Sequence, residues 1–291
     1  MNYGYYTLDV FTNQRFGGNP LAVFPQAEGI DGATMQQIAR ELNLSETVFV
    51  GDPVAENQFP IRIFTPASEL PFAGHPTVGT AFLLAKLGLA TGEQLVLKEG
   101  VGDVPVEVSL HQGFARFKVA QLPEVSESHL TEQDVADLLG INKEAVVRKP
   151  IVSSCGIPFQ MLELADQETV DQAELNLGVW KERCPDNSLS DLYLFSRKED
   201  GQLYTRMFGP AFGIPEDPAT GSAAAALTGA LALEAVQQNF KHEVLTFMVE
   251  QGVRMGRPSR IECGATFNDG VVTELSVAGQ SVLISEGRFL L

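Results

Sequence analysis

The feature of the sequence that most constrains its fold is an internal repeat. When the chain is shifted by 144 positions, residues 62–89 align without a gap onto residues 206–233, and 9 of the 28 positions are identical. Chance composition would give roughly two identities. The matches include the pattern Arg-x-Phe-x-Pro-Ala, which begins at Arg62 and at Arg206, so they are not confined to alanines and leucines of apolar helices. We interpret the repeat as the duplication of one structural unit.

Hydrophobic patterning predicts an α+β fold made of two pseudo-symmetric halves. Each half would contain a mostly antiparallel sheet wrapped around one central helix. Alternating and β-branched runs predict strands at 3–10, 21–24, 59–64, 104–110, 114–119, 159–164, 192–196, 203–208 and 271–275. Helices are expected at 31–42 and 131–139, and two apolar, buried helices at 76–87 and 218–235. A capping box begins the helix at Thr131, and Gly140 ends it.

The division between the halves is expected at residues 120–128, where a proline and polar residues cluster. Roughly the last 14 residues, after Gly279, have the character of one more strand that returns to the first half. The predicted domains are therefore residues 1–122 with 279–291, and residues 123–278. A duplicated unit of this kind is expected to hold its site in the cleft between the halves.

Composition excludes several classes of protein. The formal charge of −17 disfavours nucleic acid and anionic membranes as partners, because both require clustered Lys and Arg. No segment reaches the ~20 apolar residues of a membrane-spanning helix, and the N-terminus lacks the pattern of a secretory signal. Three dispersed cysteines, Cys155, Cys184 and Cys263, fit a reducing compartment without a disulfide framework. We expect a cytoplasmic protein.

Motifs for bound cofactors are missing from the sequence. It contains no dinucleotide-binding or P-loop glycine pattern, no nucleophile elbow and no zinc-protease motif, and its four histidines are dispersed. We therefore expect neither a metal nor an organic cofactor, which leaves chemistry to the side chains.

The repeat directs attention to the two turns that precede the apolar helices, residues 69–77 and 213–222. A helix N-terminus presents unpaired N–H groups and about half a positive charge. Two such termini beside one cleft would bind a small carboxylate without an arginine. Gly74, Gly221 and Ser222 would allow the backbone and a hydroxyl group to approach that ligand closely.

Three titratable residues have both structural and functional interpretations. Asp217 precedes a proline at a predicted helix start, which is typical of an N-cap. His75, between Gly74 and Pro76, could belong only to a turn. Glu46 follows a helix and begins an apolar run, where its carboxylate could be solvated. Spacing alone leaves these alternatives open.

The chain resembles the phenazine-biosynthesis PhzF-like isomerases, whose fold is similar to that of diaminopimelate epimerase. The resemblance covers most of the chain. It rests on the segments Asp9–Thr12, Gly18–Pro20, Glu41–Thr47, Arg62–Pro66, Glu69–Thr77, Glu216–Ala223, Gln251–Gly252, Gly279 and Ser285–Gly287. It implies the two-half fold that the repeat predicts independently, and it implies function for Glu46, His75 and Asp217.

The resemblance also implies a mechanism. The two catalytic cysteines of the epimerase would fall at Ala73 and Asp217, neither of which is a thiol, so a two-thiol racemase mechanism is excluded. Glu46 would be the single acid and base that moves a proton on one face of the substrate. His75 and Asp217 would orient the substrate, and Gly74, Gly221 and Ser222 would hold its carboxylate. We expect burial to raise the pKa of Glu46.

The resemblance implies a small carboxylate substrate and a homodimer, and the prototype of the family isomerises a dihydro-hydroxyanthranilate. Whether this protein takes part in phenazine synthesis is left open. Two alternatives remain. One is an amino-acid epimerase or racemase that uses Glu46 and Asp217 as a two-base pair. The other is a catalytically inactive metabolite-binding protein.

Overall fold

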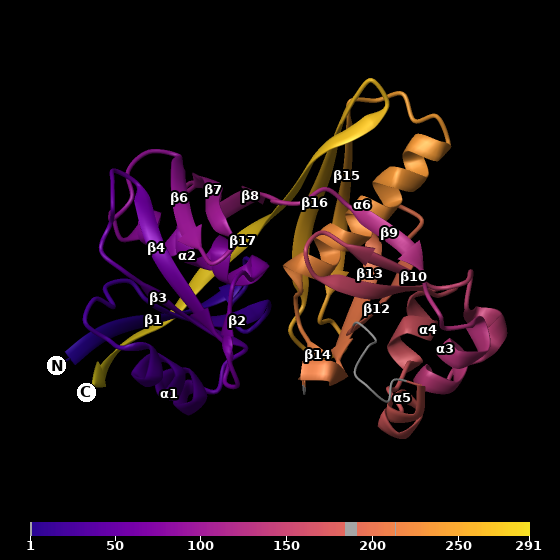
Figure 1. The fold of residues 1–291 in the computed structure, drawn as a ribbon, viewed down its shortest axis with the longest axis horizontal. Helices are drawn as coiled ribbons and strands as arrows, with labels where there is room; N and C mark the ends of the chain where they lie inside the picture. Colours follow the sequence, from indigo (N-terminus) through magenta and orange to yellow (C-terminus); the bar gives the residue numbers. More distant parts are fainter. Residues whose placement is uncertain (1, 184–190, 213) are drawn as a thin grey trace. The chain divides into compact units, whose positions relative to one another are not determined.

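The computed structural model describes residues 2–183, 191–212 and 214–291. Contacts between Cα atoms divide the chain into two compact units. Unit 1 comprises Met1–Lys118 and Val277–Leu291, and unit 2 comprises Val119–Ser276. The last strand, β17 (Val271–Leu290), contributes residues to both units (Figure 1). Cys184 and Gly213, which the sequence analysis named, lie outside the described residues.

Unit 1 is a strand-rich unit with one internal helix. Its elements are β1 (Asn2–Val10), β2 (Asn19–Phe24), α1 (Gly32–Leu42), β3 (Glu46–Val50), β4 (Gln58–Phe64), β5 (Glu69–Leu70), α2 (Gly74–Lys86), β6 (Gln94–Glu99), β7 (Gly102–Ser109) and β8 (Phe114–Lys118). The β2–β3 and β4–β6 pairs are parallel, while β1–β2, β3–β4, β4–β5, β6–β7 and β7–β8 are antiparallel. Strand β17 pairs with both β1 and β8, so this sheet closes on itself.

Helix α2 is the core of unit 1. It contacts β1, β2, β3, β6, β7 and β8, and its residues from Gly74 to Ala85 are buried. A helix that is apolar on every face must be enclosed in this way. Gly79 permits the close approach to the sheet, because a Cβ atom there would lie 2.6 Å from Leu21 of β2.

Unit 2 begins with β9 (Glu124–Glu127), α3 (Glu132–Leu139), β10 (Ile151–Ser154), β11 (Pro158–Glu163), α4 (Gln167–Gln172) and α5 (Leu177–Arg183). It continues with β12 (Asp191–Arg197), β13 (Leu203–Gly209), β14 (Ile214–Asp217), α6 (Gly221–Gln237), β15 (Val244–Gln251) and β16 (Ser259–Asn268). Short 3₁₀ helices lie at Lys143–Ala145 and Pro210–Phe212. The β11–β12 and β13–β15 pairs are parallel, while β9–β10, β10–β11, β12–β13, β13–β14 and β15–β16 are antiparallel.

Helix α6 occupies the corresponding place in unit 2, where it contacts β9, β10, β11, β15 and β16. Helices α3, α4 and α5 form a separate group, visible in Figure 1. Their apolar side chains pack against β11, β12 and β13 in one cluster that includes Leu138, Trp180 and Leu194. This group covers part of unit 2 and contributes none of the predicted site residues.

The α+β class and the locally specified elements agree with the sequence predictions. Asp31 caps α1 by accepting a hydrogen bond from the Thr34 amide, Thr131 and Asp134 form the expected capping box, and Gly140 ends α3 in the left-handed conformation. The C-terminal part differs from expectation, because the two predicted strands there are one continuous strand, β17. Strands β3, β5, β6, β9, β10, β14, β15 and β16 and helices α4 and α5 were not predicted.

Candidate functional site

Unit 1 brings two of the predicted residues into contact. Glu46 is the first residue of β3, and His75 is the second residue of α2. The Oε2 atom of Glu46 lies 3.0 Å from the Nε2 atom of His75, with side-chain exposures of 14% and 6% respectively. The parallel pairing of β3 with β2, which sets Glu46 opposite Leu21, places the carboxyl group against the first turn of α2.

The electrostatic state of His75 follows from its surroundings. Burial lowers the pKa of His75 to about 3, although a hydrogen bond to the Pro20 carbonyl acts in the opposite direction. Because Nε2 faces Glu46, the nitrogen that donates to Pro20 is Nδ1. The imidazole is therefore neutral at physiological pH, with its hydrogen on Nδ1 and a lone pair on Nε2.

A second buried carboxyl group supports the beginning of α2. Glu99, the last residue of β6, is 9% exposed, and its Oε1 atom lies 2.8 Å from the Thr77 hydroxyl. The same hydroxyl lies 2.8 Å from the carbonyl oxygen of Ala73. The Thr77 hydroxyl therefore has two acceptors for its one hydrogen, the Glu99 carboxyl group and the Ala73 carbonyl. Burial raises the pKa of Glu99 to about 8, although the hydrogen bond from Thr77 acts in the opposite direction.

The structure corrects the expectation for Asp217 as a helix cap. Asp217 is the last residue of β14, where it pairs with Met207, and α6 begins at Gly221 rather than at Pro218. The N-cap is Thr220, whose hydroxyl donates to Asp217 Oδ2 at 2.5 Å. The Asp-Pro pair therefore ends a strand, because the pairing of β14 with β13 extends the backbone through Asp217.

Gln251 holds Asp217 and the start of α6 in place. This residue, the last of β15, is completely buried. Its Nε2 atom donates to the Asp217 carbonyl at 2.8 Å and to the Thr220 hydroxyl at 3.0 Å, and its Oε1 atom accepts from the Thr220 amide at 3.2 Å. The Tyr193 hydroxyl donates to the same Oε1 atom at 3.1 Å. This role of Gln251 was not predicted, because the residue was singled out only as part of the resemblance.

The remaining predicted residues lie at the two helix starts. Gly74 is the first residue of α2, while Gly221 and Ser222 are the first two residues of α6. In unit 2 the structure therefore groups Gly221 and Ser222 with Asp217, and in unit 1 it groups Gly74 with the Glu46–His75 pair. At both starts, backbone N–H groups of the first turn lack partners within their helix.

The gap-free alignment of the repeat holds for the strands but not for the helices. Ile63 of β4 pairs with Leu70, and Met207 of β13 pairs with Asp217, so the turn in unit 2 is three residues longer. The helices correspondingly begin 221 − 74 = 147 positions apart. Within the repeat, the N-cap that matches Ala73 is thus Thr220 rather than Asp217. Neither N-cap is a thiol.

The two cysteines that the structure describes are poor candidates for this chemistry. Burial raises the pKa of both Cys155 and Cys263 to about 12, which leaves these thiols unreactive. Within residues 2–183, 191–212 and 214–291, no three His, Cys, Asp or Glu side chains are placed to hold a metal ion. No described helix has the length and apolar character needed to cross a membrane.

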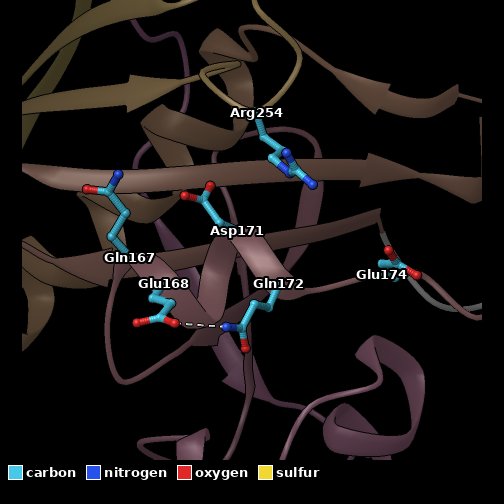
Figure 2. A pocket seen from close by; sticks show the side chains of 6 residues that line it. All are labelled: Gln167, Glu168, Asp171, Gln172, Glu174 and Arg254. Atoms are coloured by element: carbon cyan, nitrogen blue, oxygen red, sulfur yellow. Dashed lines mark hydrogen bonds between the residues drawn. The ribbon is translucent and has the colours of Figure 1, made fainter.

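A pocket of about 630 Å³ in unit 2 lies away from the predicted residues. Figure 2 shows its lining, which consists of Gln167, Glu168, Asp171, Gln172, Glu174 and Arg254. Three carboxyl groups against one guanidinium group disfavour an anionic ligand there. We therefore do not assign the carboxylate substrate to this pocket.

Comparison with known proteins defines first the fold and then the family. The fold is that of a PhzF-family phenazine biosynthesis protein from Bacillus anthracis, which superposes with a TM-score of 0.88 at 23% identity over the whole of both chains. The family model "Phenazine biosynthesis-like protein" matches residues 8–287. The chain belongs to this PhzC-PhzF family of isomerases.

Two curated relatives cover almost the whole chain. An uncharacterized isomerase of Mesorhizobium japonicum is 38% identical over 99% of this chain and 98% of its own length. The trans-2,3-dihydro-3-hydroxyanthranilate isomerase of Pseudomonas aeruginosa is 32% identical over 98% of both chains. The second relative acts on a small cyclic carboxylate, as its name states.

Proposed function

We propose that this protein is a cofactor-independent isomerase of a small carboxylate substrate, in which Glu46 alone removes and returns a proton on one face. The observation that carries the proposal is the 3.0 Å approach of Glu46 Oε2 to His75 Nε2. A neutral imidazole with its hydrogen on Nδ1 presents a lone pair to that oxygen. Two lone pairs at this distance repel each other unless a proton lies between them. We therefore infer that the pair holds one proton, which Glu46 exchanges with the substrate.

This arrangement suits a proton shuttle. Glu46 first delivers its proton to the substrate and then, as the carboxylate, accepts one from a substrate carbon. The neutral His75 does not compete with Glu46 as an acid, because its Nε2 atom carries no hydrogen, and it favours the return of a proton to the pair. The buried Nδ1–H bond to Pro20 fixes the ring so that Nε2 stays directed at the carboxyl group. A general acid and base held in this way contributes about 10²–10⁴-fold to a rate.

In unit 2, we propose that Asp217 orients a polar group of the substrate and that the backbone N–H groups at Gly221 and Ser222 bind its carboxylate. The helix start supplies donors and a partial positive charge, which together favour a carboxylate. Gly74 would have the corresponding role at α2. The hydrogen bonds from Thr220 and Gln251 keep Asp217 fixed before any ligand arrives.

We further propose that the two units are copies of one ancestral unit. The order of parallel and antiparallel pairs along β1, β2, β3, β4, β6 and β7 is the same as along β10, β11, β12, β13, β15 and β16. A central apolar helix follows the fourth strand in each series. The shared order of strands and helix supports a duplication of one ancestral unit, after which each copy came to supply part of the chemistry.

The experiment that tests the function is a turnover assay with trans-2,3-dihydro-3-hydroxyanthranilate, the substrate named for the Pseudomonas relative. Wild type is compared with Glu46→Gln and with the matched control Glu41→Gln, which alters an exposed carboxylate in α1. The proposal predicts turnover by wild type and Glu41→Gln and a loss of at least 100-fold in Glu46→Gln. Equal turnover by all three proteins would refute the role of Glu46, whereas binding of this compound without turnover would favour a metabolite-binding protein.

A further inference from the structure

The register of unit 1 defines the position of Glu46 within its sheet. Glu46 lies opposite Leu21 of the parallel strand β2. The next residue, Thr47, pairs with Phe64 at the end of the antiparallel strand β4. Glu46 is therefore the first residue of a strand that lies between a parallel and an antiparallel neighbour, one position beyond that phenylalanine.

Asp191 occupies the same position in unit 2. It lies opposite Phe159 of the parallel strand β11, and the next residue, Leu192, pairs with Phe208 of the antiparallel strand β13. Phe208 is the repeat partner of Phe64, 144 positions later. Asp191 is thus the counterpart of Glu46 by sheet register, although neither residue lies within the aligned repeat segment.

The surroundings of Asp191 are those of a buried acid with free hydrogen-bonding capacity. The residue is 4% exposed, and its Oδ1 atom has no hydrogen-bond partner among the described residues. The Ala211 amide donates to the carboxyl group. Gly209 makes room for it, because a Cβ atom there would lie 3.3 Å from Oδ2. An unsatisfied buried oxygen destabilises a fold, so its retention requires a reason.

Asp217 is the charged group that acts on Asp191. The residues beside Asp191 on its two neighbouring strands are Phe159 of β11 and Gly209 of β13, and neither has a titratable side chain. Burial raises the pKa of Asp191 to about 7, and the negative charge of Asp217 adds to the increase. The Thr220 hydroxyl donates a hydrogen bond to the Oδ2 atom of Asp217.

We propose that Asp191 is a second proton-holding residue of this protein, whose charge state acts on that of Asp217. The part assigned to Asp217 rests on the function proposed above. Asp191 is a positioning residue, because it acts on Asp217 through its charge and does not itself bind the substrate.

The first test needs no substrate. The full chain is labelled with ¹³C at the aspartate carboxyl carbons and titrated by NMR as wild type, Asp191→Asn, Asp217→Asn and the control Asp200→Asn. The proposal predicts one resonance with a midpoint near pH 7, which is absent in Asp191→Asn and has a midpoint at least half a pH unit lower in Asp217→Asn. The control leaves it unchanged, because Asp200 is exposed in a turn.

Two results of this titration would overturn the proposal: no aspartate with a midpoint above pH 5, or a midpoint that does not respond to Asp217→Asn. The second variant keeps the test decisive if Asp191→Asn does not fold. Failure of the proposed isomerase activity leaves this titration intact, so the two failures are distinguishable.

If trans-2,3-dihydro-3-hydroxyanthranilate is turned over, the pH dependence of kcat adds a second test. Asp191→Asn is expected to lower kcat about tenfold, to leave KM within twofold and to remove the ionisation near pH 7. A variant with the pH profile of wild type would contradict the proposal. A structural role alone would lower kcat and leave the profile unchanged.

Discussion

The Nε2 atom of His75 faces the Oε2 atom of Glu46 at 3.0 Å, while the opposite ring nitrogen is bonded to the Pro20 carbonyl. This relationship assigns a different task to each group. The backbone carbonyl fixes the tautomer of the ring, and Nε2 of the neutral ring lies beside the carboxyl group. We propose that the pair holds one proton without requiring a charged imidazole.

The tautomer of His75 is the first testable consequence. Because its pKa is lowered to about 3, His75 is expected to remain neutral at pH 5, with its hydrogen on Nδ1. The other three histidines, His111, His129 and His242, serve as internal references. Long-range ¹H–¹⁵N NMR at pH 5 should show one histidine with the Nδ1–H pattern, absent in His75→Asn. Four histidines that all titrate between pH 6 and 7 would contradict the assignment.

Glu99 provides a prediction about stability. Its pKa is about 8 in the folded chain and 4.5 in a model peptide. A raised carboxyl pKa means that the folded state binds the proton more tightly, so stability is fully present below pH 4.5 and declines as the pH rises to about 8. Glu99→Gln, which remains neutral, should therefore unfold at higher urea concentration than wild type at pH 8, with little difference at pH 4.5.

The expected gain for Glu99→Gln at pH 8 is on the order of a few kcal/mol. A glutamine is suitable at this position because Gln251 is its counterpart in unit 2. Glu99 follows the last residue of β6 that pairs with β4, and Gln251 follows the last residue of β15 that pairs with β13. The amide of Gln251 holds the start of α6. Glu107→Gln, at an exposed site in β7, is the matched control. Equal pH dependence of wild type and Glu99→Gln would show that Glu99 is ionised in the fold.

The repeated arginines predict unequal effects of the same substitution. Arg206 is buried, bonds Glu216 through two nitrogens at 2.8 and 2.9 Å, and donates to the carbonyls of Val170 and Ala173. Its repeat partner Arg62 bonds Glu69 at 2.7 Å, but both side chains are more than 40% exposed. Arg206→Ala should cost about 3–5 kcal/mol because it leaves a buried charge unpaired. Arg62→Ala should cost about 0–1 kcal/mol.

Urea unfolding followed by circular dichroism measures both arginine variants against wild type. A small cost for Arg206→Ala, or a similar cost for the two, would mean that burial does not determine the contribution of this ion pair.

The sequence was sufficient where structure is determined locally. The caps of α1 and α3 depend on residues three positions apart, and both formed as predicted. The helix start near Asp217 was predicted incorrectly, because strand pairing with Met207 outweighs the local preference of an Asp-Pro pair for a cap. The three-residue offset between the two helices of the repeat was likewise not predicted, because a gap-free alignment does not reveal the longer turn in unit 2.

The site residues show the same limit. The partnership of Glu46 and His75 joins positions 29 apart and depends on the parallel pairing of β2 with β3, which no local pattern specifies. Only resemblance directed attention to Glu46. Asp191 and Glu99 acquire their properties from register and burial alone. The Glu-Gly and Gln-Gly pairs at 99–100 and 251–252 were the one sequence signal that could have drawn attention to the supports of the two helix starts.

The central claim, that Glu46 alone moves the proton, is tested most directly by proton NMR of the reaction in D₂O with trans-2,3-dihydro-3-hydroxyanthranilate, using wild type beside Glu46→Gln. The account predicts that wild type forms an isomerised product with a single deuterium at the new C–H position and without inversion of a stereocentre. It predicts no product with the variant. Deuterium at an inverted centre would indicate a two-base racemase instead. Product formation by Glu46→Gln at the wild-type rate would contradict the mechanism.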